Sequence, residues 1–149
     1  MPTVHTRVAN AADAGTVSSL LTSLGYPTEP HDIPARLEAM DASTNVVLLA
    51  LEGEGAPVGL VAVHLLSSLH ANAPVAMIMA LVVAPEGRGR GVGRELVRAA
   101  ETWAVARGCE RLMVTSAEHR SDAHAFYPAC GMPYTGRRFA KMLPASGRV

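Results

Sequence analysis

The stretch LVVAPEGRGRGVGR, residues 81–94, is the most informative part of this 149-residue chain. An apolar, strand-like run ends at Pro85, a turn rich in glycine and arginine follows, and an amphipathic helix pattern then begins. Glycines let backbone N–H groups approach a bound anion, and a helix start adds unpaired N–H groups and a partial positive charge. Arg88, Arg90 and Arg94 supply donors that match phosphate oxygens. The stretch therefore predicts a cradle for a pyrophosphate.

This cradle differs from the two commoner nucleotide-binding loops. No Gly-Lys-Ser/Thr closes the turn, and no acidic residue follows at the position where a dinucleotide fold binds a ribose. The glycine-rich turn also follows a run of strands and not an N-terminal βαβ unit. A classical dinucleotide-binding fold is therefore not expected.

Strands and helices are predicted on both sides of the turn from hydrophobic periodicity and from capping and turn residues. The expected strands are Thr3–Val8, Asn45–Leu51, Val58–Leu66, Val75–Val83, Arg111–Thr115 and Arg137–Leu143. The expected helices are one capped by Asn10 and ended by Gly25, one capped by Asp32, and the segments Val92–Ala106 and Ser121–Cys130. The order β-α-α-β-β-β-α-β-α-β predicts a mixed α/β fold around one sheet, with residues 1–149 forming a single domain.

Composition narrows the class of protein. Thirteen basic residues balance thirteen acidic ones, so no overall field favours nucleic acid or an anionic membrane. No apolar run reaches the roughly 18 residues of a membrane-spanning helix, and no secretory signal is evident. The two cysteines have no metal-binding spacing and are expected to be reduced thiols. We expect a cytoplasmic protein without a metal site, a nucleic-acid partner or a membrane partner.

Two details of the central stretch resemble GNAT superfamily N-acetyltransferases. Arg88-x-x-Gly91-x-Gly93 matches the family signature Arg/Gln-x-x-Gly-x-Gly/Ala, and the preceding strand ends in the typical Leu-Val-Val-x-Pro. The resemblance implies a mixed, mostly antiparallel sheet of six to seven strands, splayed at strands 4 and 5 and flanked by about four helices. It also implies that acetyl-CoA binds here. The residues carried over for this role are Leu81, Val82, Val83, Arg88, Gly89, Arg90, Gly91, Val92, Gly93 and Arg94.

Within that set the resemblance distributes the roles along the cofactor. Leu81 and Val83 would contact the pantetheine arm and the acetyl group, while residues 88–93 would hold the pyrophosphate, with Arg94 beside them. The oxyanion that develops during acyl transfer needs a backbone donor. The amide of Val82 or Val83 is the candidate.

A second motif lies at residues 120–132, RSDAHAFYPACGM. It resembles the family pattern Asn-x-x-Ala-x-x-x-Tyr-x-x-x-Gly-Phe at Ala123, Tyr127 and Gly131, but Arg120 replaces the Asn and Met132 the Phe. The thiolate of coenzyme A must be protonated as it leaves, and a phenol near the sulfur can act as the general acid. The resemblance assigns this catalytic role to Tyr127.

The sequence does not identify a general base. Many relatives use a Glu on the central strands, whereas Val75–Val83 has Met77, Ile78 and Met79 and no carboxylate. The candidates are His70 and the residues Glu29, His31, Asp32, Glu118 and His119, and an acceptor that arrives deprotonated would need none of them.

The resulting prediction is an acetyl-CoA-dependent N-acetyltransferase that acts on a primary amine of a small molecule or peptide by direct attack, and that is plausibly a homodimer. The alternative is a non-catalytic acyl-CoA-binding sensor or interaction module, which the missing Glu and the replaced Asn favour. A generic phosphate binder is a third interpretation, but it does not explain the spacing of Ala123, Tyr127 and Gly131.

Overall fold

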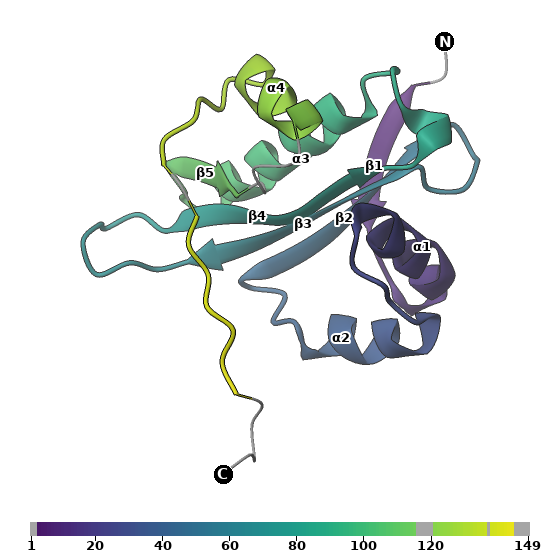
Figure 1. The fold of residues 1–149 in the computed structure, drawn as a ribbon, viewed down its shortest axis with the longest axis horizontal. Helices are drawn as coiled ribbons and strands as arrows, with labels where there is room; N and C mark the ends of the chain where they lie inside the picture. The colour runs from purple at the N-terminus through teal and green to yellow at the C-terminus, as the bar shows by residue number, and fades with distance from the viewer. Residues whose placement is uncertain (1–2, 116–120, 137, 145–149) are drawn as a thin grey trace. The chain divides into compact units, whose positions relative to one another are not determined.

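A computed structural model describes residues 3–115, 121–136 and 138–144 and divides the chain into two compact units, Met1–Val114 and Thr115–Val149. The first unit contains a sheet and three α-helices, and the second contains one α-helix (Figure 1). The strands are β1 (Val4–Val8), β2 (Asn45–Glu52), β3 (Gly59–Leu66), β4 (Val75–Val83) and β5 (Arg111–Val114). The helices are α1 (Ala14–Leu24), α2 (Ile33–Ala39), α3 (Val92–Ala106) and α4 (Ser121–Ala129).

The sheet has the strand order β1-β2-β3-β4-β5. Its first four strands pair antiparallel, and β5 pairs parallel to β4 after the crossover through α3. A parallel neighbour requires such a crossover, since a short hairpin can join only antiparallel strands. The expected mixed α/β class and the four helices are confirmed for the described residues.

The expected number of six to seven strands is wrong, because the sheet has five strands in the part of the chain that is described. The predicted closing strand began at Arg137, which lies outside the described residues. Residues 138–143 are described and form no strand, and Phe139 and Met142 are highly exposed there. An apolar run becomes a strand only when it pairs with another strand, and a sequence pattern does not supply that partner.

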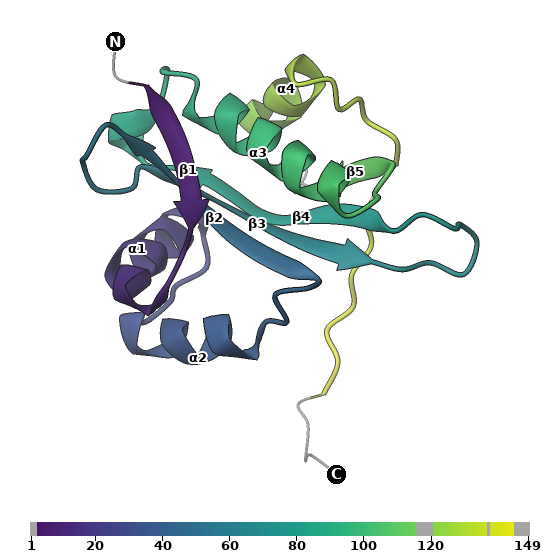
Figure 2. The same ribbon diagram turned by 180° about the vertical axis from the view of Figure 1, so that it is seen from behind.

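Each face of the sheet has its own apolar core within the first unit. On one face α3 packs its buried residues Val92, Leu96, Ala100 and Ala104 against β2, β3 and the first half of β4. On the opposite face Val17 and Leu20 of α1 and Ile33 of α2 pack against other residues of β2 and β3 and the second half of β4. Figures 1 and 2 show α3 on one side of these strands and α1 and α2 on the other.

A β-bulge at Met79 changes which residues of β4 face each core. Ala62 of β3 is opposite Ala80, but Val63 is opposite Ile78, so Met79 is the extra residue. Before the bulge Ala76 and Ile78 pack on the α3 side, and after it Ala80 and Val82 pack on the α1 side. Residues two apart normally share a face, so the extra residue moves the even-numbered residues of β4 from one core to the other. Met79 itself is 64% exposed.

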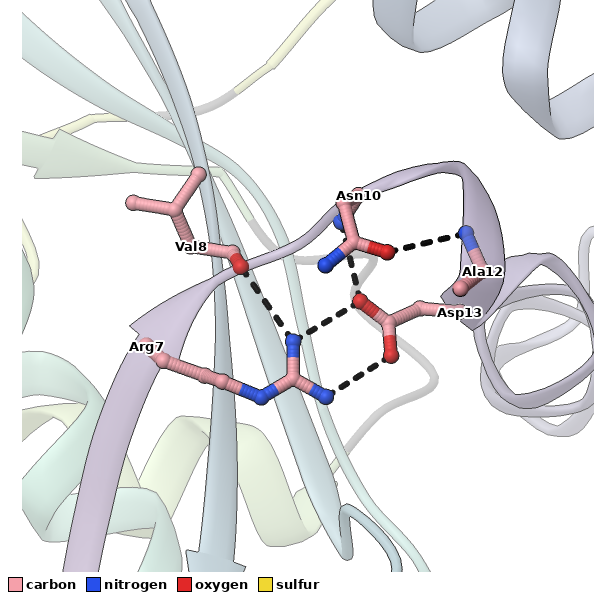
Figure 3. Close-up of polar contacts among 5 residues, drawn as sticks. All are labelled: Arg7, Val8, Asn10, Ala12 and Asp13. Atoms are coloured by element: carbon pink, nitrogen blue, oxygen red, sulfur yellow. Dashed lines mark hydrogen bonds and ion pairs between the residues drawn. The ribbon is translucent and has the colours of Figure 1, made fainter.

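The first helical turn depends on a cluster of polar residues after β1 (Figure 3). Asn10 accepts a hydrogen bond from the Ala12 N–H, and the Asn10 N–H donates to Asp13, so the two residues form a capping box around the 3₁₀ turn Ala11–Asp13. Arg7 on β1 holds the same carboxylate through two hydrogen bonds of 2.8 Å. The expected cap at Asn10 is confirmed.

The expected cap at Asp32 is wrong. The 3₁₀ turn Pro30–Asp32 leads directly into α2, so Asp32 already has helical backbone angles and its side chain forms no capping hydrogen bond.

We expect Asp13→Asn to lower the free energy of unfolding by about 1–2 kcal/mol at pH 7, since it removes a charged acceptor that is 8% exposed. The hydrogen bonds from Arg7 lower the pKa of the Asp13 carboxyl. A lowered carboxyl pKa stabilises the folded state above the ordinary value of about 4, and this contribution disappears as the pH falls through the folded pKa. Urea unfolding at pH 7 and at pH 3 tests this, and the difference from wild type should shrink at pH 3.

Glu54→Gln, in the exposed turn between β2 and β3, is the control and should change stability little at either pH. An Asp13→Asn difference that stays constant with pH would argue against the charged pair.

Candidate functional site

Within the part of the chain that is described, the second half of β4 has an open edge. Pairing with β5 covers Val75–Ile78 and ends at the contact between Ile78 and Val114, while β4 continues for five more residues, Met79–Val83. The splay between strands 4 and 5 that the family resemblance implied stays a prediction, because residues 116–120, which follow β5, lie outside the described residues. A strand edge without a neighbouring strand presents N–H and C=O groups that an extended ligand can pair with.

Backbone hydrogen bonds show which amides lie on that edge. The Ala84 N–H donates to the Val58 carbonyl at 2.7 Å, on the β3 side, while the Val83 carbonyl accepts instead from Arg88 Nε at 3.3 Å. Because backbone groups alternate sides along a strand, the N–H groups of Leu81 and Val83 point away from β3. The Val82 amide points toward β3, so Val83 and not Val82 lies on the open edge.

The turn after β4 approaches the strands so closely that it requires a glycine. Pro85–Gly87 is a 3₁₀ turn, and a Cβ atom added at Gly87 would lie 3.0 Å from the Val58 Cβ. Gly89 and Gly91 have φ angles of 77° and 80°, in the left-handed region that favours glycine. A Cβ atom at either of them would meet nothing within 4 Å, so the backbone is open to a ligand there.

The start of α3 completes this part of the site. Gly91 is the N-cap residue, and the first intrahelical hydrogen bond runs from the Glu95 N–H to the Gly91 carbonyl at 3.0 Å. The N–H groups of Val92, Gly93 and Arg94 precede that bond, and a glycine cap has no side chain that could accept from them. Val92 is only 1% exposed and anchors this turn in the core below the loop.

The arginines of the loop have different surroundings. Arg88 Nε donates to Val83, which directs the exposed side chain back along the end of β4. Arg90 forms an ion pair with Glu52 at 3.0 Å, and Glu52 is 11% exposed at the end of β2. Arg94 is exposed on the first turn of α3. The ion pair of Arg90 therefore connects the loop to the sheet, a contact that the sequence did not predict.

Residues 81–94 thus form one continuous candidate surface in the first unit. An open strand edge can pair with an extended, amide-containing arm, and the glycine turn and helix start can bind an anionic group at its end. The pantetheine diphosphate part of coenzyme A has this combination of groups. The expected residues Leu81, Val83 and Arg88 to Arg94 are brought together in this surface, with Val82 turned toward the α1 core.

Tyr127 belongs to the second unit, so the structure does not place it with these residues. It is half-buried on α4, and its ring contacts Phe126 edge-on at a centroid distance of 5.3 Å. The Tyr127 carbonyl accepts from the Met132 N–H at 2.9 Å and the Pro128 carbonyl from the Gly131 N–H at 3.0 Å, which is the Schellman pattern. Gly131 has a φ of 82°, so helix termination explains the glycine of the second motif.

The candidate bases are mostly exposed. Glu29, His31 and His70 lie on the surface. The carboxylate of Asp32 lies 3.4 Å from His31 Nε2 and 4.0 Å from Arg36 Nη2. Glu118 and His119 lie outside the described residues.

The sequence analysis did not single out His64 on β3, which is half-buried with its Nδ1 atom 2.8 Å from Asn45 Oδ1. The sequence signal for this residue would have been the presence of a histidine within a predicted strand.

Other kinds of site find no support among the described residues. No group of three or more histidine, cysteine, aspartate or glutamate side chains there could hold a metal ion. Burial raises the pKa of the Cys109 thiol, which makes it a poor nucleophile. The described helices include none long and apolar enough to cross a membrane.

Comparison with known proteins identifies similar sequences. The model of the acetyltransferase (GNAT) family matches residues 16–132. An aminoglycoside N(6')-acetyltransferase type 1 of Stenotrophomonas maltophilia is 30% identical over 139 residues, which cover 91% of this chain and 89% of that protein. An aminoalkylphosphonate N-acetyltransferase of Salmonella typhimurium is 30% identical over 148 residues, which cover 96% and 94%.

Solved structures share the fold. A GNAT family acetyltransferase of Staphylococcus aureus has a TM-score of 0.79 at 24% identity, with 96% of this chain and 100% of that chain covered. An aminoglycoside N-acetyltransferase solved in complex with CoA has a TM-score of 0.83 at 18% identity, with 97% of each chain covered.

We expect Gly91→Ala to lower the free energy of unfolding by roughly 1–2 kcal/mol, because it places a Cβ atom on a residue with a left-handed backbone. Gly15→Ala is the matched control, since Gly15 lies in α1 with open space around it and no positive φ, and it should stabilise the protein by about 0.5 kcal/mol. Urea unfolding measures both changes. Equal effects of the two substitutions would contradict the loop geometry.

Proposed function

Because the chain belongs to the acetyltransferase (GNAT) family, we propose that it transfers the acetyl group of acetyl-CoA to a primary amine of a small molecule or peptide. The observation that carries this proposal is the open edge Met79–Val83, which leads directly into the glycine-arginine loop and the start of α3. A cytoplasmic location, a homodimer and the absence of nucleic-acid and membrane partners stay predictions from the sequence.

The residues of the first unit fit coenzyme A. The edge of β4 at Leu81 and Val83 would pair with the pantetheine amides, and residues 88–93 would hold the pyrophosphate through backbone N–H groups. The close approach is supported by Gly89 and Gly91, where no side chain stands between the backbone and a ligand. Arg88 and Arg94 would add charge, while Arg90 would contribute mainly by fixing the loop to Glu52.

When bound, acetyl-CoA supplies an activated acetyl group as a thioester. The acceptor amine would attack the thioester carbon directly, so no covalent enzyme intermediate and no cysteine nucleophile are needed. The Val83 amide, on the open edge, is the candidate donor to the developing oxyanion. The phenol of Tyr127 would protonate the departing thiolate, a role supported by the spacing of Ala123, Tyr127 and Gly131 in the second motif.

The relatives suggest a class of acceptor. One is an aminoglycoside acetyltransferase and the other an aminoalkylphosphonate acetyltransferase, and both kinds of acceptor are small molecules that bear a primary amine. A polycationic aminoglycoside would favour a dense cluster of carboxylates. The loop Gly25–Asp32, which would border the acceptor, contains only two carboxylates, those of Glu29 and Asp32. A small amine with few charges is therefore the better candidate.

A sensor that binds acyl-CoA without turnover is the second candidate. The observation in its favour is that β4 carries no acidic residue that could act as a base. Turnover by the isolated protein separates the two functions.

We expect wild type to release free thiol from acetyl-CoA only when an amine is added, with a panel of aminoalkylphosphonates, small diamines and aminoglycosides as acceptors. Arg88→Ala should raise the KM for acetyl-CoA about tenfold, because it removes a charge beside the pyrophosphate. Tyr127→Phe should lower kcat about 100-fold with little change in that KM, because it removes the proton donor.

Arg98→Ala is the control for charge, since Arg98 lies on the exposed side of α3 and pairs with Glu95. It should leave both constants near their wild-type values. Calorimetry measures the binding of acetyl-CoA. If wild type binds it but turns over no amine, and Arg88→Ala does not bind it, the result would support the sensor. No binding by wild type would overturn the proposed function.

A further inference from the structure

His64 occupies a defined position on the sheet. It lies on β3 directly opposite Asn45 of β2 and Met77 of β4, so the three side chains share one face. That face also carries Val47, Leu49 and Leu60, which pack against α1 and α2. His64 is therefore on the opposite side of the sheet from α3, and it is half-buried there.

Hydrogen bonds fix the orientation of the imidazole and its proton. Asn45 Nδ2 donates to the Asp41 carbonyl and to Thr44 Oγ1, each at 3.1 Å, so the amide oxygen of Asn45 is turned toward His64. That oxygen can only accept a hydrogen bond, and it lies 2.8 Å from His64 Nδ1. The Nδ1 atom must therefore carry the proton, which leaves the lone pair of neutral His64 on Nε2.

The register places His64 near the point where the pairing of β4 with β5 ends. Met77 is opposite His64, and the pairing of β4 with β5 ends one residue later at Ile78. One strand spacing and two residues along β4 separate His64 from the bulge residue Met79, which corresponds to about 8–10 Å between Cα atoms. A bound amine spans such a distance, either directly or with one water molecule.

We infer that His64 is the proton acceptor for the amine and that Asn45 positions it, an inference that rests on the proposed acetyl transfer. The thioester would lie at the open edge of β4, and the amine would reach it from the face that carries His64. The neutral Nε2 atom takes a proton from the ammonium group, and the amine nitrogen then forms the bond to the acetyl carbon. The bond from that carbon to sulfur breaks, and the thiolate takes a proton from Tyr127. The nitrogen loses its second proton to solvent, which also reprotonates the Tyr127 phenolate and takes the proton from His64.

The surroundings of His64 are consistent with this role. Its neighbours across the sheet, Asn45 and Met77, carry no charge. Asp41 contributes its backbone carbonyl to the network, while its carboxylate accepts hydrogen bonds from the N–H and the hydroxyl of Ser43. A base is also what β4 lacks, since none of its residues is ionisable.

The test compares His64→Gln, Asn45→Ala and wild type by thiol release across a range of pH with the best acceptor of the amine panel. We expect kcat/KM for the amine to fall about 100-fold in His64→Gln, with the KM for acetyl-CoA unchanged. The acid limb of the pH profile should move up toward the pKa of the free amine, because the acceptor must then arrive deprotonated. Asn45→Ala should show a smaller fall of the same kind. Imidazole added to His64→Ala should restore part of the rate.

His5→Gln on the exposed face of β1 is the matched control and should keep wild-type kinetics. Nitrogen-15 NMR of the imidazole groups gives a readout that needs no turnover, and His64 should be protonated at Nδ1 in wild type. A proton on Nε2, or full activity of a folded His64→Gln with an unchanged pH profile, would overturn the inference and leave the proposed transfer intact. Failure of wild type to turn over any amine would overturn both.

Discussion

The structure depends on one irregularity in a central strand, the bulge at Met79. An unbroken β4 would keep alternate residues on the same faces throughout, and a single strand could not supply Ile78 to the α3 core and Val82 to the α1 core. The pairing with β5 ends at the same place, so five residues of β4 lose a neighbour on one side. One extra residue thereby changes which side chains of β4 reach each core, at the place where the open edge begins.

The loop that follows shows how a neutral protein can build an anion site. The proposed site would use backbone N–H groups at Gly89, Gly91 and the first turn of α3, and the helix start adds a partial positive charge. Arg90 forms an ion pair with the nearly buried Glu52, and this contact fixes the loop in place. A rigid backbone and a few local charges would therefore attract an anion without a strong overall electrostatic field.

Much of this arrangement could be predicted from the sequence. Hydrophobic periodicity and the flanking glycines predicted the bounds of β4 and α3 correctly, because both elements carry strong patterns and clear stop signals. The bulge was not predictable, since Met79 lies in an unbroken apolar run. The number of strands was wrong because residues 138–143 do not form the closing strand that their apolar pattern predicted. The pairing of His64 with Asn45 joins residues 19 apart and depends on register, which periodicity alone does not give.

The open edge of β4 also has a consequence for the stability of the whole molecule. Unpaired strand edges attract other strands and favour association between chains, and on this edge Arg88 already occupies the Val83 carbonyl. A ligand that pairs with the edge satisfies those backbone groups and competes with any foreign strand. Ligand concentration in the cell would then control the solubility and lifetime of this protein as well as its occupancy.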